Sequence, residues 1–205
     1  MAPSAPGPSP ATVGLDGGAV RRLASAWVSD VPIRPVRATV ERIRAHDAVV
    51  AAALDTGSTP LPARFGQVFA SDDECEGAIS AKFGDLSAAL ARVAGMVEMT
   101  ILLRATATPA PDRSSGTAYL ESLARGAQAE DMLRRASREV TARLSEHVRE
   151  SAERVSGGVA TLSHLVEREA LDAYRTRAEA LAAGLAGVRA TIVGPGAPYS
   201  FGAAE

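Results

Sequence analysis

Few residues in this sequence combine the types and spacing that catalysis or metal binding requires. The three histidines, His46, His147 and His164, lie far apart in the chain, so no two have the i,i+3 or i,i+4 spacing of a helical metal site. His46 is followed by Asp47, but neighbouring helix residues point about 100° apart and cannot easily form a catalytic dyad with each other. We interpret His46 and Asp47 as a half-buried polar pair that ties a helix to a nearby loop. A ligand site is the alternative.

An acidic run, Asp72-Asp73-Glu74, directly precedes the only cysteine, Cys75. These carboxylates could be metal ligands or an acid–base pair. However, Ser71 and Glu74 also have the spacing of a helix-capping box, and acidic side chains stabilise the first turn of a helix, so we favour this structural interpretation. The same carboxylates would raise the pKa of Cys75, which argues against a nucleophilic thiolate. A single cysteine forms neither an intrachain disulfide nor a thiolate zinc site.

Composition and the remaining motifs exclude further classes of function. The formal net charge is −2, and basic and acidic residues are interspersed, which argues against a nucleic-acid surface. The glycine doublets match neither the P-loop nor the dinucleotide fingerprint. Residues 1–10 lack the basic start and apolar run of a signal peptide, and no apolar run approaches the roughly 20 residues of a membrane span. We expect a cytoplasmic protein with no cofactor, metal, nucleic-acid or membrane partner.

The predicted helices and strands that position these residues begin after an N-terminal leader. Residues 1–18 are rich in Pro, Ala, Ser and Gly, and we expect them to be disordered. Loose alternation over 23–31 predicts a strand. Apolar residues at helical spacing predict an amphipathic helix over 38–54, which carries the histidine–aspartate pair. Residues 61–69 then predict a short strand, bounded by prolines.

The capping box at Ser71 predicts the start of a helix, whose apolar residues recur four and three apart until Gly95 ends it. Strict alternation over 97–105 predicts a strand with one core face. A Pro-, Ser- and Thr-rich stretch, 107–116, predicts a linker between two domains.

The second half predicts a long helix over 117–155, with several oppositely charged i,i+4 pairs and one narrow apolar stripe that includes Leu120, Leu123 and Leu133. A helix of this kind must lay its stripe on a partner. The predicted elements that follow are a break at 157–158, a strand at 159–166, a helix at 167–186 and a strand at 188–193.

Helices and small sheets recur in both halves, so the predicted fold class is α+β. The predicted organisation is a disordered leader (1–18), a first domain (19–106), a linker (107–116) and a second domain (117–205). Most of the few aromatic residues are expected in the core. Tyr199 and Phe201 differ, because they lie in a tail bounded by Gly and Pro, where an aromatic docks back on the protein or contacts a partner.

Six segments, together spanning the chain from about residue 20 to its end, resemble signatures of the gas vesicle protein F/L (GvpF/GvpL) family. Any one is weak alone, but their shared order is specific. They are the His46-Asp47 pair before Val49-Val50, the Pro-x-Arg-Phe-Gly motif at Pro62–Gly66 within 61–69, Val97-Glu98-Met99, Gly116-Thr117-Ala118-Tyr119-Leu120, Ser163-His164-Leu165-Val166, and the tail from Gly194-Pro195 to Pro198-Tyr199-Ser200-Phe201.

This resemblance implies an N-terminal ferredoxin-like α/β sandwich and a C-terminal domain with a long helix and a short strand–helix–strand unit. It implies no enzymatic activity. It implies a gas vesicle assembly factor that binds and chaperones the small hydrophobic shell protein during nucleation or early growth, with other minor gas vesicle proteins as further partners. The candidate partner-binding residues are Arg64, Phe65, Phe69, Tyr199 and Phe201.

Two departures from the family pattern carry expectations. The sequence lacks the Tyr-rich strand with which family members usually open, so we expect a sheet edge to be left open in the first domain. Gly196-Ala197 replaces the usual Trp-Pro of the tail, which removes a large aromatic contact. Two alternative functions remain at this point: a small-ligand sensor or enzyme using the ferredoxin-like domain, and a helical adaptor using the long helix.

Overall fold

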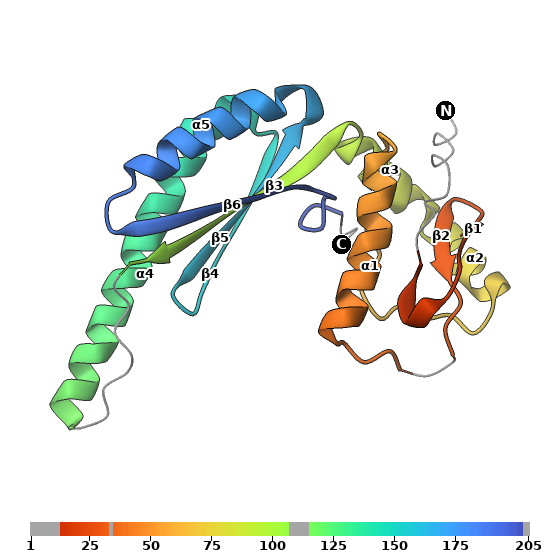
Figure 1. The fold of residues 1–205 in the computed structure, drawn as a ribbon, viewed down its shortest axis with the longest axis horizontal. Coiled ribbons are helices and arrows are strands. Elements are labelled where there is room, and N and C mark those ends of the chain that lie inside the picture. The colour runs from red at the N-terminus through yellow and green to blue at the C-terminus, as the bar shows by residue number, and fades with distance from the viewer. Residues whose placement is uncertain (1–12, 33–34, 107–114, 203–205) are drawn as a thin grey trace. The chain divides into compact units, whose positions relative to one another are not determined.

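The computed structural model describes residues 13–32, 35–106 and 115–202. The chain divides into two compact units (Figure 1). The first unit consists of Met1–Met96 and Gly196–Glu205, and the second of Val97–Pro195. The expected boundary at 107–116 therefore falls inside the second unit, and residues 107–114 lie outside the described residues.

The first unit begins with ordered backbone where a disordered leader was expected. Leu15–Gly17 forms a short 3-10 helix (η1), and the N–H of Gly14 donates to the carbonyl of Gly18 at 2.8 Å. The guanidinium of Arg42 binds both carboxylate oxygens of Asp16, at 2.7 and 2.8 Å. The expectation of disorder is thus wrong for 13–18, because local backbone bonds and this ion pair hold the segment. Residues 1–12 lie outside the described residues.

A hairpin replaces the single strand predicted over 23–31. β1 (Val20–Leu23) pairs antiparallel with β2 (Ala26–Ser29), and Leu23 faces Ala26 across a two-residue turn. The turn requires a positive φ, which Ala24 adopts at 48°. Because neither Gly nor Asn marks this turn, the sequence pattern did not reveal it.

The described part of the first unit also contains the helices α1 (Val40–Asp55), α2 (Asp72–Ala81) and α3 (Phe83–Val93). α1 confirms the predicted amphipathic helix and begins at Thr39, whose side chain accepts a hydrogen bond from the N–H of Arg42. The single helix predicted from Ser71 is instead two helices, because Lys82 leaves helical geometry at φ −108° and ψ 15°.

The segment 61–69 is not a strand. It runs as an irregular loop with a turn in which the N–H of Gln67 donates to the carbonyl of Arg64 at 3.3 Å. Gly66 holds a φ of +84° at this turn, which favours glycine. Pro60 and Pro62 lack the N–H groups that pairing in a sheet would use, which the alternation of apolar residues concealed.

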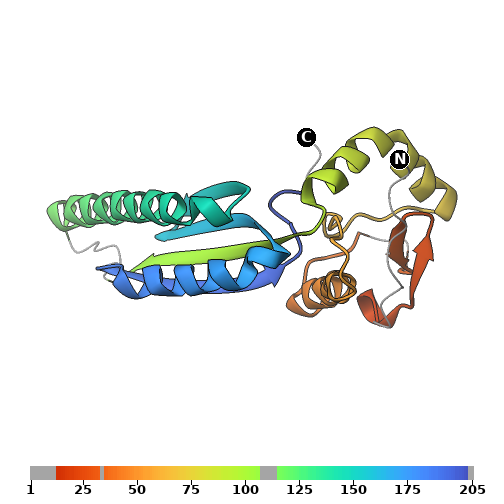
Figure 2. The ribbon, with the colours of Figure 1, turned by 90° about the horizontal axis from the view of Figure 1, so that it is seen from above.

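The second unit contains β3 (Met96–Ala105), α4 (Gly116–Leu144), β4 (Glu150–Ser156), β5 (Val159–Glu167), α5 (Leu171–Gly184) and β6 (Val188–Gly196). Its sheet has the order β4-β5-β3-β6, with β4 and β5 antiparallel. Figure 2 shows α4 and α5 running alongside one another, with the strands visible between them. This β-α-β-β-α-β chain order with the last strand beside the first is the ferredoxin-like arrangement.

The α+β class is therefore confirmed, but the ferredoxin-like arrangement occupies 96–196 and not 19–106. β3 was assigned to the first domain, yet it lies between β5 and β6 in the sheet of the second unit. The predicted helix over 117–155 ends at Leu144, and a strand occupies Glu150–Ser156. Gly157 and Gly158, with φ of 59° and 73°, form the hairpin turn between β4 and β5.

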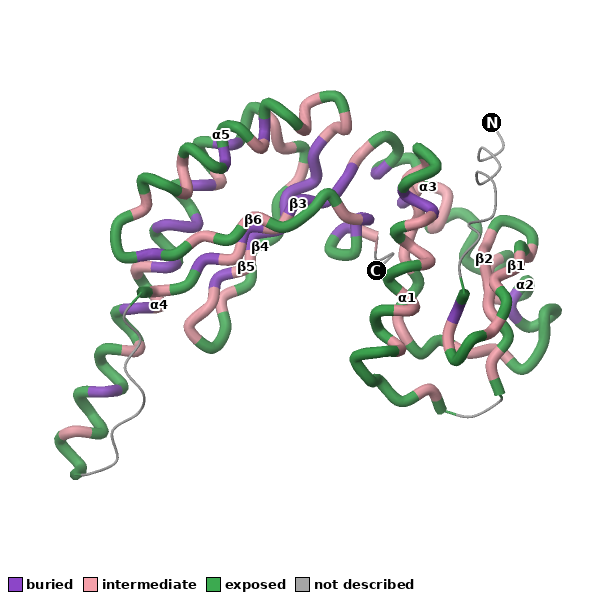
Figure 3. The backbone as a smooth tube through the Cα atoms, viewed as in Figure 1, coloured by how far each residue is buried: buried purple, intermediate pink, exposed green. Residues whose placement is uncertain are grey.

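The core of the second unit lies between its sheet and its helices. Figure 3 shows buried residues concentrated on β3 and β5. Alternate residues of β3, Val97, Met99, Ile101 and Leu103, are buried as the sequence predicts. None of the helices in the described parts of the chain is both long and apolar enough to cross a membrane.

Candidate functional site

The C-terminal tail docks on the first unit through its two aromatic residues. The phenol of Tyr199 donates a hydrogen bond to the carboxylate of Asp47 on α1 at 3.3 Å. Phe201 is 6% exposed, and its carbonyl accepts a hydrogen bond from the guanidinium of Arg92 on α3. Tyr199 remains 46% exposed, and partial burial together with the charge of Asp47 raises the pKa of its phenol. The tail is thus anchored by Phe201 and leaves Tyr199 accessible.

The 61–69 loop contributes to the same region. The rings of His46 on α1 and Phe65 meet edge to face, with centroids 5.8 Å apart and an interplanar angle of 89°. Gly202 lies against the loop, since a Cβ built on it would be 3.4 Å from Leu61. We call the residues His46, Asp47, Phe65, Tyr199 and Phe201 the tail surface.

The tail surface brings together five of the residues singled out from the sequence. The two others are less closely involved: Arg64 is exposed in the 61–69 loop, and Phe69 is half-buried at its end. His46 and Asp47 point to different neighbours, as their adjacent helix positions require. Nε2 of His46 is buried and has no hydrogen-bond partner among the described residues.

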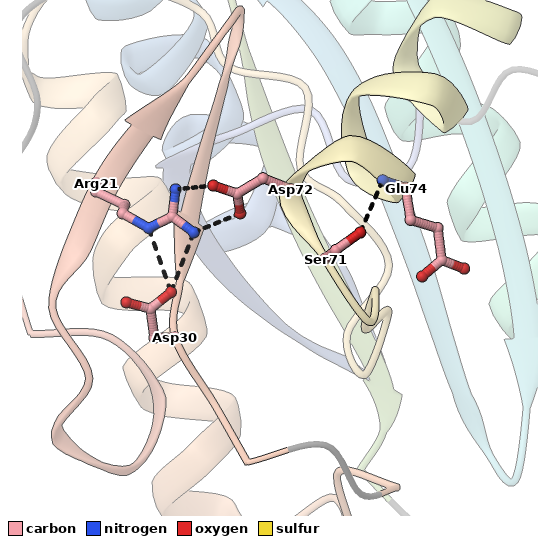
Figure 4. Close-up of polar contacts among 5 residues, drawn as sticks. All are labelled: Arg21, Asp30, Ser71, Asp72 and Glu74. Atoms are coloured by element: carbon pink, nitrogen blue, oxygen red, sulfur yellow. Dashed lines mark hydrogen bonds and ion pairs between the residues drawn. The ribbon is translucent and has the colours of Figure 1, made fainter.

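The acidic run at the start of α2 serves structural contacts (Figure 4). Asp72 binds the guanidinium of Arg21 on β1 at 2.6 and 2.9 Å, and Arg21 also binds Asp30 at 3.1 Å. The hydrogen bond from Arg21 lowers the pKa of Asp72. Ser71 caps the helix by accepting from the N–H of Glu74 at 3.2 Å. No group of three or more His, Cys, Asp or Glu in the described segments could hold a metal ion.

Cys75 is buried in α2. Burial raises the pKa of its thiol, and the nearby carboxylates of Asp72 and Glu76 raise it further. The predicted direction of this shift therefore agrees with the structure, and the thiol stays protonated at neutral pH, which disfavours nucleophilic chemistry.

A buried polar network occupies the core of the second unit. His164 on β5 is fully buried, and its Nδ1 lies 2.8 Å from the hydroxyl of Tyr174 on α5. Its Nε2 lies 3.4 Å from Oγ1 of Thr141 on α4. Burial lowers the pKa of His164 to about 4. A neutral imidazole accepts at one nitrogen and donates at the other, so this side chain links both helices to the sheet.

α4 carries an exposed apolar patch that the sequence pattern did not predict. Leu120 and Leu123 were assigned to the buried stripe of the long helix, but they are 66% and 51% exposed, and Tyr119 is 42% exposed. We call these three residues the α4 patch. The buried face of the same helix runs through Ser122, Ala129 and Leu133 to Val140 and Leu144, and Leu120 and Leu123 lie off this face. Figure 1 shows the N-terminal part of α4 extending past the strands of its own unit.

Comparisons with known proteins agree on the fold and the family. The crystal structure of the gas vesicle protein GvpF from Anabaena sp. PCC7120 has a TM-score of 0.76 and 16% identity, covering 97% of this chain and 93% of that one. GvpF from Microcystis aeruginosa has a TM-score of 0.73 and 17% identity, covering 97% of this chain and 96% of that one. No curated protein matches the sequence. The family model "Gas vesicle synthesis protein GvpL/GvpF" matches residues 2–203, and the chain therefore belongs to the GvpL/GvpF family of gas vesicle proteins.

Proposed function

We propose that this protein is a non-catalytic gas vesicle assembly factor that binds the small hydrophobic shell subunit and keeps it soluble until the subunit is added to the vesicle. Family membership supports a role connected with gas vesicles. The observation that carries the finer proposal is the α4 patch, with Leu120 66% exposed and Leu123 51% exposed. Other minor gas vesicle proteins are proposed as further partners, and the gas vesicle as the site of action.

The α4 patch has the chemistry that such a partner needs. Leu120 and Leu123 are three residues apart, so they project from one face of the helix and can bind the apolar face of another segment. An ion pair between Arg125 and Glu121, with an N–O distance of 3.7 Å, lies beside them. Contiguous exposed apolar side chains bordered by charge are typical of protein-binding surfaces.

The tail surface, together with Arg64 and Phe69 of the adjoining 61–69 loop, is the second proposed contact region. Arg64 and Tyr199 are exposed, and Phe65 and Phe69 are half-buried, so these four side chains can contribute to binding. Phe201 is buried, and its proposed role is to hold the tail in place. The two proposed contact regions can be tested separately, because Leu120 and Leu123 belong to the second unit and the tail surface belongs to the first.

The test is co-expression of the shell subunit with a tagged copy of this protein, followed by measurement of soluble and captured subunit. The variant Leu120→Ser with Leu123→Ser should reduce capture about tenfold or more, since truncating central apolar contacts has effects of this size. The matched control is Val40→Ser with Ile43→Ser on α1. These residues have the same spacing and are 58% and 48% exposed, and the control should capture the subunit as well as the wild type does.

Three outcomes are decisive. If the wild-type protein neither captures the subunit nor increases its soluble fraction, the proposed function is wrong. If the α4 double variant captures normally, the function stands but the α4 patch does not carry it. A loss confined to Tyr199→Ala or Arg64→Ala would assign binding to this second contact region instead.

A further inference from the structure

Among the strands of the described residues, β4 is an edge strand with a neighbour on one side only. In the sheet order β4-β5-β3-β6 it is terminal (Figure 1). Residues Ser151 to Arg154 are exposed. A groove of about 320 Å³ separates this strand from α4, and it is lined by Arg138, Thr141, Ala142, Ser151, Ala152 and Glu153. Open edges of this kind pair readily with another strand.

The hairpin geometry shows which backbone groups face outward. The two-residue turn closes on the pair Ser156 and Val159, and the closing pair of such a turn is hydrogen-bonded. Hydrogen-bonded and non-bonded pairs alternate along an antiparallel ladder. The N–H and C=O groups of Ser151 and Glu153 therefore point away from β5. The carbonyl of Leu165, the partner of Glu150, points toward β4 as this phase requires, since it accepts from the N–H of Arg149 at 2.8 Å just before the strand begins.

The side chains of β4 are arranged symmetrically about Ala152. Glu150, Ala152 and Arg154 share one face of the sheet, because they face Leu165, Ser163 and Thr161 of β5. Ser151 and Glu153 lie on the opposite face and line the groove beside α4. An acidic and a basic residue thus stand two positions either side of Ala152 on the same face.

We propose that β4 pairs antiparallel with β4 of a second copy of this chain, with the twofold axis at Ala152, so that the two sheets join into one. Glu150 then faces Arg154 of the second copy, and Arg154 faces its Glu150. The outward backbone groups of Ser151 bond those of Glu153 in the second copy, and that Glu153 side chain enters the groove lined by Arg138. This interface is independent of the proposed shell binding.

Neighbouring registers are less favourable. Centring the axis on Glu153 places two like charges directly opposite each other, which destabilises a strand pair. Centring it on Ser151 requires Arg149 to face Glu153 of the second copy, but Arg149 already binds Glu167 with an N–O distance of 2.8 Å. Charged residues on an edge often prevent pairing. In β4, however, the acidic Glu150 and the basic Arg154 would face each other across the twofold axis, so their charges favour the register centred on Ala152.

The first test is chemical crosslinking in solution. In the full chain with the buried Cys75 changed to Ser, Ala152→Cys should form a disulfide-linked dimer on mild oxidation, since directly facing residues in a non-bonded antiparallel pair have Cα atoms about 4.5 Å apart. Glu153→Cys and Arg154→Cys in the same background should crosslink much less. Efficient crosslinking through either of these positions in preference to residue 152 would overturn the register.

The second test needs no cysteine. Sedimentation equilibrium of the wild-type protein should show a concentration-dependent dimer. Glu150→Arg and Arg154→Glu should each weaken it about tenfold or more, because each replaces two attractive cross-strand pairs with two repulsive ones. The double variant Glu150→Arg with Arg154→Glu should restore it. A protein that is monomeric at all accessible concentrations, or a dimer that ignores both single reversals, would show the proposal to be wrong.

Discussion

The phenol of Tyr199 donates a hydrogen bond to the carboxylate of Asp47, and this contact joins residues 152 positions apart. It lies at the surface, whereas Phe201 two residues later is buried in the same unit. The two aromatic residues of the tail therefore divide their roles: Phe201 provides apolar burial, and Tyr199 provides an accessible polar contact.

This division predicts unequal effects on stability. Phe201→Ala should lower the free energy of unfolding of the first unit by about 3 kcal/mol, since it empties a buried aromatic site. Tyr199→Phe should cost about 1 kcal/mol or less, because a single exposed hydrogen bond contributes little. Urea denaturation followed by fluorescence of Trp27, the only tryptophan, measures both. Equal losses from the two changes would contradict the assigned roles.

Acid should destabilise the second unit through His164. Its pKa is lowered to about 4 by burial, and the unfolded chain has a pKa of about 6.5. Between pH 6.5 and 4 the imidazole of His164 binds more protons in the unfolded state than in the folded state, so the free energy of unfolding falls as the pH decreases. Below pH 4 both states are protonated, and the loss caused by His164 levels off. The total loss is about 3 kcal/mol, by the linkage of pKa to free energy.

The measurement is denaturant unfolding at several pH values, with His164→Gln as the reference. The variant should be less stable at pH 7 but should lose less stability on acidification than the wild type. Carboxylates titrate in both proteins, and the difference between the two profiles isolates the histidine. Parallel profiles would show that His164 is not buried in its neutral form.

The two parts of α4 should respond differently to the same substitution. Leu133 is fully buried and Leu123 is 51% exposed. Leu133→Ala should cost about 3 kcal/mol, whereas Leu123→Ala should change stability by about 0.5 kcal/mol or less. Thermal or urea denaturation measures this contrast. A large loss at Leu123 would mean that the α4 patch is covered in the folded protein and is not available to a partner.

The start of α4 should depend on its cap. The hydroxyl of Ser115 accepts from the N–H of Ala118 at 3.1 Å, and the first turns of the helix that follows carry the exposed side chains of Tyr119, Leu120 and Leu123. Ser115→Ala should cost about 1 kcal/mol, and Ser115→Asp should retain the cap. Amide hydrogen exchange around 118–123 should accelerate in the alanine variant alone. Unchanged exchange would show that the cap does not hold this end of the helix.

Sequence patterns predicted an element correctly where the residues that define it lie close together in the chain. The alternation of β3, the cap at Ser71, the helix α1 and the α+β class were all predictable from residues near one another in the chain. Residues of the tail surface could be nominated from the sequence, but their convergence could not, since Tyr199 and Asp47 meet only after the chain has returned to the first unit.

The sequence by itself determined the helix cap at Ser71, the clearest strand, the fold class and the family. Only the tertiary structure decided that Glu150–Ser156 is a strand, that β3 belongs to the second unit, and that Leu120 and Leu123 are exposed. The physical reason is that charges four residues apart suit a helix as well as they suit the edge of a sheet. Pairing with distant strands settles the choice, and tertiary packing decides which face of α4 is covered.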